Sequence, residues 1–220
     1  MNNQESHLDI YQTEDEQVEA LKKWWQENGK SAIFGVLLGL SAIFGWREWQ
    51  DYETEMAASA SNLYQQMVAA AREQKAEELI KVANEISANY ESTAYSVFAR
   101  LALARVAVEN DDLDSAITDL RWALDKTSQE SLRHVITLRL ARVLIAQSKY
   151  DEARAIVNSQ NQGEFALSYL ELEADIFRKE DKISEARQSY EKAISLAKAG
   201  NLDSSMLDLK LDDLGREESK

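Results

Sequence analysis

The chain has 220 residues, with no cysteine, no proline and seven glycines, and its formal net charge is −14. Without cysteine it holds no disulfide, no cysteine-based metal site and no thiol nucleophile. An acidic surface repels phosphate backbones and anionic lipid, which argues against nucleic-acid binding and against a soluble part that lies flat on a membrane. Because turns and strand edges usually recruit proline and glycine, their scarcity predicts an all-α protein.

The N-terminal region, residues 1–30, is expected to be a tail with one short helix. Residues 1–12 have the character of a disordered segment. Thr13 and Glu16 fit a capping box, apolar residues then recur on one face, and Gly29 can end the helix. Two interpretations stay open: the amphipathic helix rests its tryptophans at a membrane interface, or it docks to a cytoplasmic signalling partner.

Residues 31–46, SAIFGVLLGLSAIFGW, contain no polar side chain larger than serine. At 1.5 Å per residue this stretch is about 24 Å long, shorter than a hydrocarbon core of about 30 Å. Its flanks extend it, because cationic side chains reach the head-group layer and tryptophans favour the interface. The sequence therefore predicts a transmembrane helix over residues 31–49 with these interface anchors: Trp24, Trp25, Lys30, Trp46, Arg47 and Trp49.

A buried core helix and a cleaved signal peptide are the alternatives for this segment. Core helices seldom lack charge over such a length, and a signal peptide begins with a short basic region rather than a long acidic one. Three lysines precede the apolar stretch 31–46, whereas Arg47 alone follows that stretch before Arg72. The positive-inside rule then predicts a cytoplasmic N-terminus and places the C-terminal bulk of the chain, residues 50–220, on the outer side of the membrane.

Small residues recur within the predicted span. Gly35 and Gly39 form a GxxxG motif, and Ser41 and Gly45 repeat the same spacing. Small side chains let helices approach closely in lipid, so these four residues are the predicted contact with a partner membrane helix. That partner is either a second copy of the chain or another membrane protein.

Beyond the span, three segments beginning at Leu101, Leu138 and Glu171 share a pattern. Each carries an alanine in its first helix and another alanine twelve positions later, with polar residues between the two helices. This spacing resembles the tetratricopeptide repeat, a helical hairpin of about 34 residues, although the early tryptophan and the final proline of that repeat are missing. The alanines are Ala104, Ala116, Ala141, Ala153, Ala174 and Ala186.

The repeat pattern predicts an α-solenoid, with an ordinary helical bundle as the alternative. A weaker unit, KAEELIKVANEISANY, places Leu79 and Ile86 in the register of a second helix. Together with the helical pattern over residues 48–73, it is expected to form a degenerate or capping repeat. The predicted organisation is therefore a tail (1–30), a transmembrane helix (31–49) and a helical repeat domain (50–220).

By analogy with the repeat family, the first helix of each hairpin lines a concave groove that suits a peptide or a partner helix. The alternative is that the N-terminal helix or residues 203–215 of the same chain fill it. The first two repeats would contribute Phe98, Leu101, Arg105, Val108, Val135, Leu138, Arg142 and Ile145. The third repeat would contribute more polar positions, namely Ser168, Glu171, Asp175 and Arg178.

No pattern typical of catalysis accompanies these segments. The two histidines, His7 and His134, are far apart, and His134 is expected at a helix surface or junction. The sequence has no glycine-rich phosphate loop, no nucleophile–histidine pairing and no metal-ligand spacing. We therefore expect neither an enzyme nor a bound cofactor or metal.

Residues 10–49, IYQTEDEQVEALKKWWQENGKSAIFGVLLGLSAIFGWREW, resemble the start of the YfgM-type family of Gram-negative inner-membrane proteins. The second repeat, VITLRLARVLIAQSKYDEARAIV, resembles that family as well. The resemblance implies an ancillary subunit of the SecYEG translocon that works with a PpiD-type periplasmic chaperone on newly exported chains. Two hypotheses stay open beside it: an envelope stress regulator that acts through its cytoplasmic tail, and a scaffold of an outer-membrane protein assembly complex.

Overall fold

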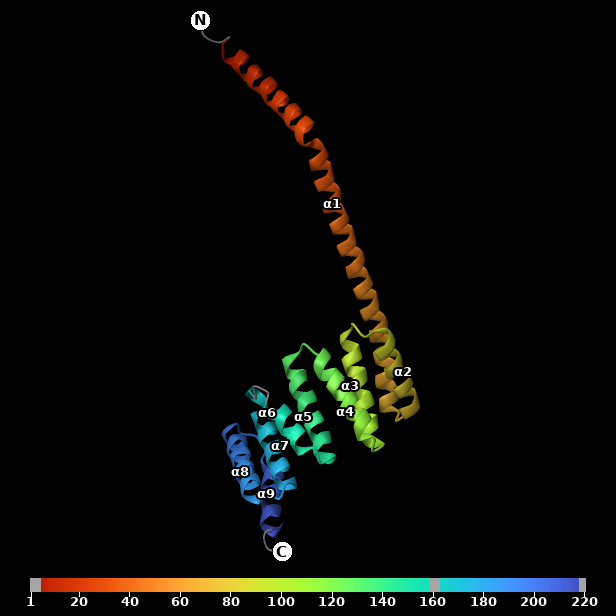
Figure 1. The fold of residues 1–220 in the computed structure, drawn as a ribbon, viewed down its shortest axis with the longest axis vertical. Coiled ribbons are helices and arrows are strands. Elements are labelled where there is room, and N and C mark those ends of the chain that lie inside the picture. The colour runs from red at the N-terminus through yellow and green to blue at the C-terminus, as the bar shows by residue number, and fades with distance from the viewer. Residues whose placement is uncertain (1–4, 159–162, 218–220) are drawn as a thin grey trace. The chain divides into compact units, whose positions relative to one another are not determined.

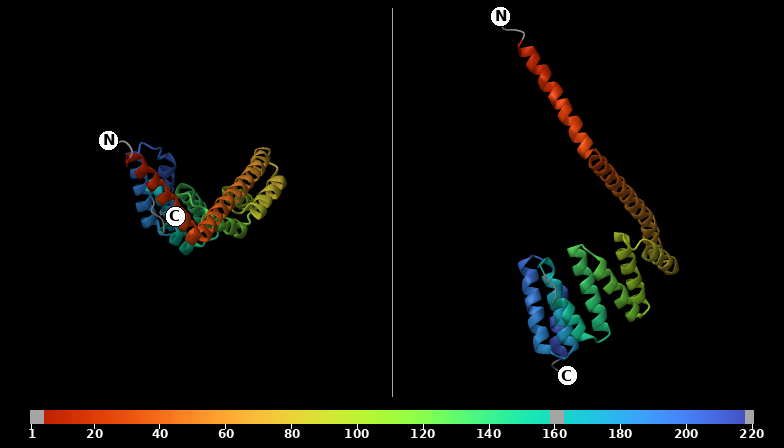
Figure 2. Two further views of the ribbon diagram at one scale, coloured as in Figure 1. Left: turned by 90° about the horizontal axis from the view of Figure 1, so that it is seen from above. Right: turned by 45° about the horizontal axis from the view of Figure 1, so that its top comes forward.

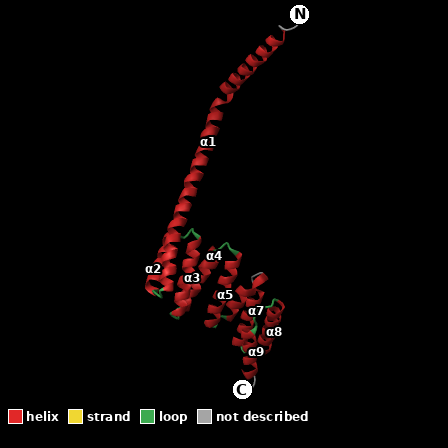
Figure 3. Cartoon of the chain, turned by 180° about the vertical axis from the view of Figure 1, so that it is seen from behind, coloured by secondary structure: helices red, strands yellow, loops and turns green. Residues whose placement is uncertain are grey.

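The computed structural model describes the backbone of residues 5–158 and 163–217, and the side chains of residues 16–158 and 163–215. The chain divides into two compact units, Met1–Glu55 and Met56–Lys220. Throughout the described residues the secondary structure is helical, with short connecting loops (Figure 3). The all-α prediction is confirmed.

The first unit is built from the N-terminal part of α1 (Glu5–Arg72). The predicted helix start at Thr13 and helix end at Gly29 are both wrong, because α1 begins at Glu5 and continues through Gly29. Residues 5–12 are helical rather than disordered, while residues 1–4 and the side chain of Thr13 lie outside the described residues. A nucleated helix extends easily, and one internal glycine costs only about 1 kcal/mol.

The second unit begins with residues 56–72 of α1 and continues through helices that lie side by side in chain order (Figures 1 and 2). A short 3₁₀ helix, η1 (Gly163–Phe165), precedes α7. The helices are α2 (Ala76–Asn89), α3 (Ala94–Glu109), α4 (Leu113–Lys126), α5 (Glu130–Ala146), α6 (Tyr150–Asn158), α7 (Ala166–Lys179), α8 (Ile183–Ala199) and α9 (Ser205–Glu217).

Three helical hairpins, α3–α4, α5–α6 and α7–α8, coincide with the three predicted repeats. The six repeated alanines are all buried, because a methyl side chain lets neighbouring helix backbones approach closely. The bulkier residue four positions after the second alanine is buried as well: Leu120, Val157 and Tyr190. This regular burial is that of stacked repeats and not of an irregular bundle.

Each hairpin turns through one residue that is not glycine but has a positive φ. The φ angles are 58° at Gln74, 60° at Asp111, 58° at Ser148 and 58° at Asp181. The residue that follows donates its N–H to a carbonyl in the last helical turn; Asp112, for example, reaches the carbonyl of Ala107 at 2.8 Å. This is the hydrogen bond of a Schellman motif, and the same closure recurs in every hairpin.

The two ends of the repeat stack are closed by the chain itself. At the start, Met67 and Ala70 of α1 pack against Leu79 and Ile86 of α2, as the weaker sequence unit predicts. At the other end, α9 follows α8 and buries its apolar face against the last hairpin. The domain therefore comprises a degenerate first hairpin, three regular hairpins and a capping helix.

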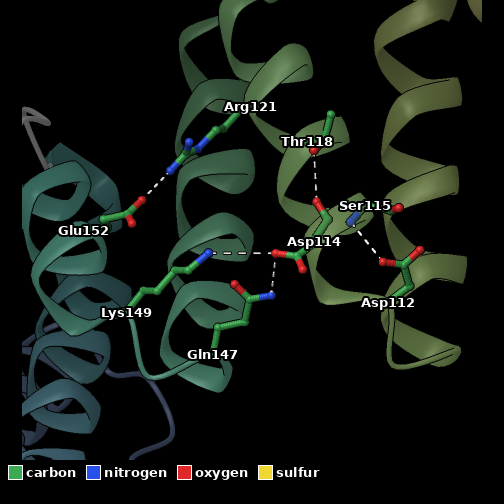
Figure 4. Close-up of polar contacts among 8 residues, drawn as sticks. All are labelled: Asp112, Asp114, Ser115, Thr118, Arg121, Gln147, Lys149 and Glu152. Carbon is green, nitrogen blue, oxygen red and sulfur yellow. Dashed lines mark hydrogen bonds and ion pairs between the residues drawn. The ribbon is translucent and has the colours of Figure 1, made fainter.

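Polar contacts join the first two regular hairpins (Figure 4). Arg121 of α4 forms an ion pair with Glu152 of α6. Asp114 accepts a hydrogen bond from Gln147 Nε2 at 3.0 Å, and its carboxylate lies 3.8 Å from Lys149 Nζ. Because these side chains are largely exposed, each pair contributes only about 0–1 kcal/mol, and the apolar core provides most of the stability.

Candidate interaction surfaces

Within the described residues, α1 is the one helix long and apolar enough to cross a membrane. Only 6% of its most apolar 18-residue window is buried. Its large side chains, such as Phe34, Leu37 and Phe44, are exposed. This exposure is typical of a membrane-spanning segment rather than of a soluble core helix, whose apolar side chains are covered by protein.

The predicted interface anchors lie in pairs at the two ends of this apolar segment. The indole centroids are 6.4 Å apart for Trp24 and Trp25, and 5.2 Å apart for Trp46 and Trp49. The helical rise separates Trp25 from Trp46 by about 32 Å along the axis, close to the thickness of a hydrocarbon core. Lys30 and Arg47 are exposed, and the anchoring role of all six residues stays a prediction.

The small residues of the segment form two faces rather than one. A Cβ atom at Gly35, Gly39 or Gly45 would have no neighbouring heavy atom within 4 Å. Ser41 donates its hydroxyl to the carbonyl of Leu37 at 2.9 Å, which satisfies that group without a partner. At about 100° per residue, the Gly35–Gly39 pair lies about 120° from the Ser41–Gly45 pair. A contact with a partner helix through either face stays a prediction.

A groove of about 630 Å³ opens over the first helices of the repeats. Its walls come from residues 64–71 of α1, the turn residues Gln74 and Lys75, and helices α2, α3 and α5, all within the second unit. Four of the residues predicted for a concave groove line it: Phe98, Leu101, Arg105 and Val135. The groove therefore spans the first two regular repeats.

The other four predicted groove residues lie outside this lining. Leu138 is buried in the core between the hairpins, and Ile145 is half-buried against that core. Val108 and Arg142 are exposed at the ends of their helices. Their contact with a partner stays a prediction.

Sequence reasoning did not include several residues that line the groove. Tyr64 contributes one wall, with its ring centroid 5.4 Å from that of Tyr95 and 5.7 Å from that of Phe98. The apolar stripe of α1, which includes Leu63 and Met67, was the signal that could have identified this wall. The other unanticipated lining residues include Lys75, Leu79, Leu132 and Arg139.

The charge of the groove is opposite to that of the whole chain. Its lining holds three cations, Lys75, Arg105 and Arg139, and one carboxylate, Glu109. Arg105 donates to Glu109 at 2.8 Å, whereas Arg139 has no hydrogen bond or ion pair with any described side chain. Lys75 is also paired, with Glu73 at 2.6 Å, so Arg139 is the lining cation that would favour an acidic ligand.

In the third repeat, Asp175 stands where the first two repeats carry arginines and Glu171 where they carry leucines, and a lysine of α9 pairs with both carboxylates. Lys210 Nζ lies 2.7 Å from Glu171 and 2.8 Å from Asp175. Burial opposes the charge of Lys210, but the hydrogen bonds to Asp175 and Glu171 outweigh it and raise the pKa of the lysine. Part of the 203–215 segment therefore covers the third repeat, as one interpretation anticipated, while the groove over the first two repeats stays open.

His134 serves a structural contact. It is buried between α5 and α7, its Nδ1 lies 2.9 Å from the hydroxyl of Tyr169, and its ring stacks on Phe165 at 4.6 Å. It is therefore a junction residue and not a surface residue. Among the described residues, no cluster of histidine and acidic side chains could hold a metal ion, and the side chain of His7 lies outside them.

Comparison with known proteins covers both units of the chain. The tetratricopeptide repeat-like domain family matches residues 22–216. A protein of Escherichia coli (strain K12) named ancillary SecYEG translocon subunit is 33% identical over 94% of this chain and 99% of its own length. A protein of the same name from Haemophilus influenzae is 33% identical over 91% of this chain and 97% of its own length.

More distant relatives share the same name. A protein of Neisseria gonorrhoeae, also named ancillary SecYEG translocon subunit, is 24% identical over 91% of this chain and 97% of its own length. No solved structure matches the chain. The chain therefore belongs to the tetratricopeptide repeat-like domain family and is a homologue of proteins named ancillary SecYEG translocon subunit.

Proposed function

We propose that this protein is a membrane-anchored interaction subunit that associates with the SecYEG translocon. The observation that carries the proposal is the 33% identity to translocon subunits, which extends through the apolar helix and the repeat domain alike. The fold is consistent with this role, because α1 supplies an anchor and the repeats supply a groove for a protein segment.

The proposal includes a topology in the bacterial inner membrane. The cytoplasmic tail comprises residues 1–30, the span residues 31–49 and the periplasmic domain residues 50–220. The excess of lysines before the span supports this orientation. In the periplasm, the repeat domain would connect the translocon to a PpiD-type chaperone that receives newly exported chains.

Site-specific photocrosslinking in cells tests the proposal. We expect a photoreactive residue at Gly35 to form adducts with translocon subunits, and one at Arg105 to form adducts with a periplasmic chaperone. A probe on the outer face of α8, at Lys192, serves as the control for random collisions.

Other adduct patterns would overturn the proposal in distinct ways. Adducts restricted to outer-membrane assembly factors would support a scaffold of that complex instead. Adducts found only in the cytoplasm, from a probe at Trp24, would support a stress regulator. Translocon adducts from Gly35 without chaperone adducts from Arg105 would retain the translocon subunit and remove its link to the chaperone.

A further inference from the structure

We infer that the groove over the first two repeats binds an amphipathic helix of a partner chain, with carboxylates beside an apolar face. The inference rests on the proposed function and names the chemistry of the segment that the repeat domain receives. It is carried by the shape of the groove, the distribution of charge along the repeats and the position of α9.

The shape of the groove fits the apolar face of a helix. Its lining includes the apolar side chains of Phe98, Leu101 and Val135, together with those of Tyr64 and Leu132. A volume of about 630 Å³ lies within the range of protein ligand pockets. Grooves of this kind bind amphipathic helices through apolar side chains spaced at i, i+3 or i+4, and i+7.

The equivalent position of the three repeats shows a reversal of charge. This position is occupied by Arg105, Arg142 and Asp175. In the third repeat, the carboxylate of Asp175 is paired within the chain by Lys210. In the second repeat, Arg142 and the nearby Arg139 have no hydrogen bond or ion pair with any described side chain.

The chain thus neutralises its acidic repeat internally and leaves cations available beside the open groove. With 39 acidic and 25 basic residues, the chain has ample carboxylates, yet among the described residues none forms an ion pair with Arg139 or Arg142. Complementary charge then selects an external carboxylate and disfavours a basic segment.

A separate partner fits better than a second copy of this chain. Among the described residues of the second unit, large exposed apolar side chains gather near the C-terminal end, with Met206 and Leu209 on α9 and Leu202 just before it. The groove lies at the first repeats and α9 follows the last, so a contact between copies would join unlike ends. Such head-to-tail contacts do not close into a dimer and tend to form open chains.

Peptide binding to the full-length protein in detergent micelles tests the inference. The probe is a fluorescent helical peptide with leucines at i, i+4 and i+7 and glutamates beside them; the matched probe has lysines in place of the glutamates. We expect the glutamate peptide to bind about tenfold more tightly, and the difference to shrink with added salt. In R139E/R142E its affinity should fall about tenfold, whereas K192E should leave it unchanged.

Each contrary outcome has a defined meaning. Equal binding of both peptides, no binding of either, or an equal loss in K192E would overturn the inference. A dimer or larger mass in light scattering that R139E/R142E abolishes would show that the occupant is a second copy. The crosslink from Gly35 to the translocon tests the proposed function independently of peptide binding. If the crosslink forms but the peptide does not bind, only the assignment of the groove is wrong.

Discussion

At the scale of single residues, Lys210 connects the capping helix to the third repeat. Its ammonium lies between Glu171 and Asp175, and all three side chains are less than one-third exposed. Without the lysine, two partly buried carboxylates would face each other without a cation. The capping helix would then lose this ionic contact with the third repeat.

The variant K210M should therefore destabilise the repeat domain by about 1–3 kcal/mol, because it leaves partly buried carboxylates unpaired. Urea unfolding of the full-length protein in detergent, followed by circular dichroism, measures this loss. K192M, which removes an exposed lysine on α8, should change the free energy of unfolding by less than about 0.5 kcal/mol. An equal effect of both variants would contradict the importance of the network.

The same region should make the protein sensitive to alkaline pH. Burial raises the pKa of Tyr190, and its hydrogen bond to Asp175 raises it further. Burial also raises the pKa of Tyr169. The pKa of Lys210 is raised by its contacts with two carboxylates. The unfolded chain then loses these protons first, so stability is complete below about pH 10 and falls above it. Thermal unfolding between pH 8 and pH 11 should show a smaller fall for Y190F than for the unmodified protein; equal falls would contradict this origin.

The sequence predicted the residues that pack in the core of each hairpin. It was less informative about residues whose position depends on how separate helices lie beside one another. The buried alanines, Leu120 and Val157 could be identified because a fixed spacing forces them into the core. Arg139 could not, since its place in the groove depends on how α5 lies beside α3 and the end of α1. Leu138 shows the converse. Analogy with the repeat family assigned its side chain to the groove, whereas in the structure this side chain is buried in the core between the hairpins.

At the scale of helices and turns, the hairpins store a small strain. A positive φ costs a residue other than glycine about 1 kcal/mol or more of conformational free energy. Such a φ nevertheless occurs at Gln74, Asp111, Ser148 and Asp181. The Schellman hydrogen bonds and the packing of the helices on either side compensate for this cost. The helices themselves were easier to predict than their ends, because periodicity marks the apolar face and only local chemistry marks the boundary.

The variant Q74G should stabilise the domain by up to about 1 kcal/mol, because glycine adopts the left-handed conformation without a steric penalty. The gain is reduced by the greater freedom of glycine in the unfolded chain. The control is A155G, an exposed position within α6, which should lose about 0.5–1 kcal/mol. Urea unfolding of both variants checks the opposite signs; a loss in Q74G would show that the side chain of Gln74 contributes more than its strain.

At the scale of the whole molecule, the chain combines two parts with opposite solvent requirements. The apolar segment of α1 exposes large side chains that water would not tolerate, whereas the repeat domain covers its core and holds most of the charged side chains. The sequence predicted both parts because hydropathy and repeat spacing are properties of the sequence alone. The orientation across the membrane is different, since it depends on a few lysines and on the insertion machinery.

Labelling of single cysteines tests this orientation directly, because the natural chain contains no cysteine. Q17C lies before the span and K192C lies on the exposed face of α8. A maleimide that does not cross membranes should label K192C in intact spheroplasts, and Q17C only after lysis. The cysteine-free chain controls for background, and labelling of Q17C before lysis with K192C protected would reverse the proposed topology.

Replacing Lys22, Lys23 and Lys30 by glutamine should weaken the preference for one orientation, since the charge difference across the span would then favour neither side strongly. The same labelling experiment should then give mixed labelling at both sites.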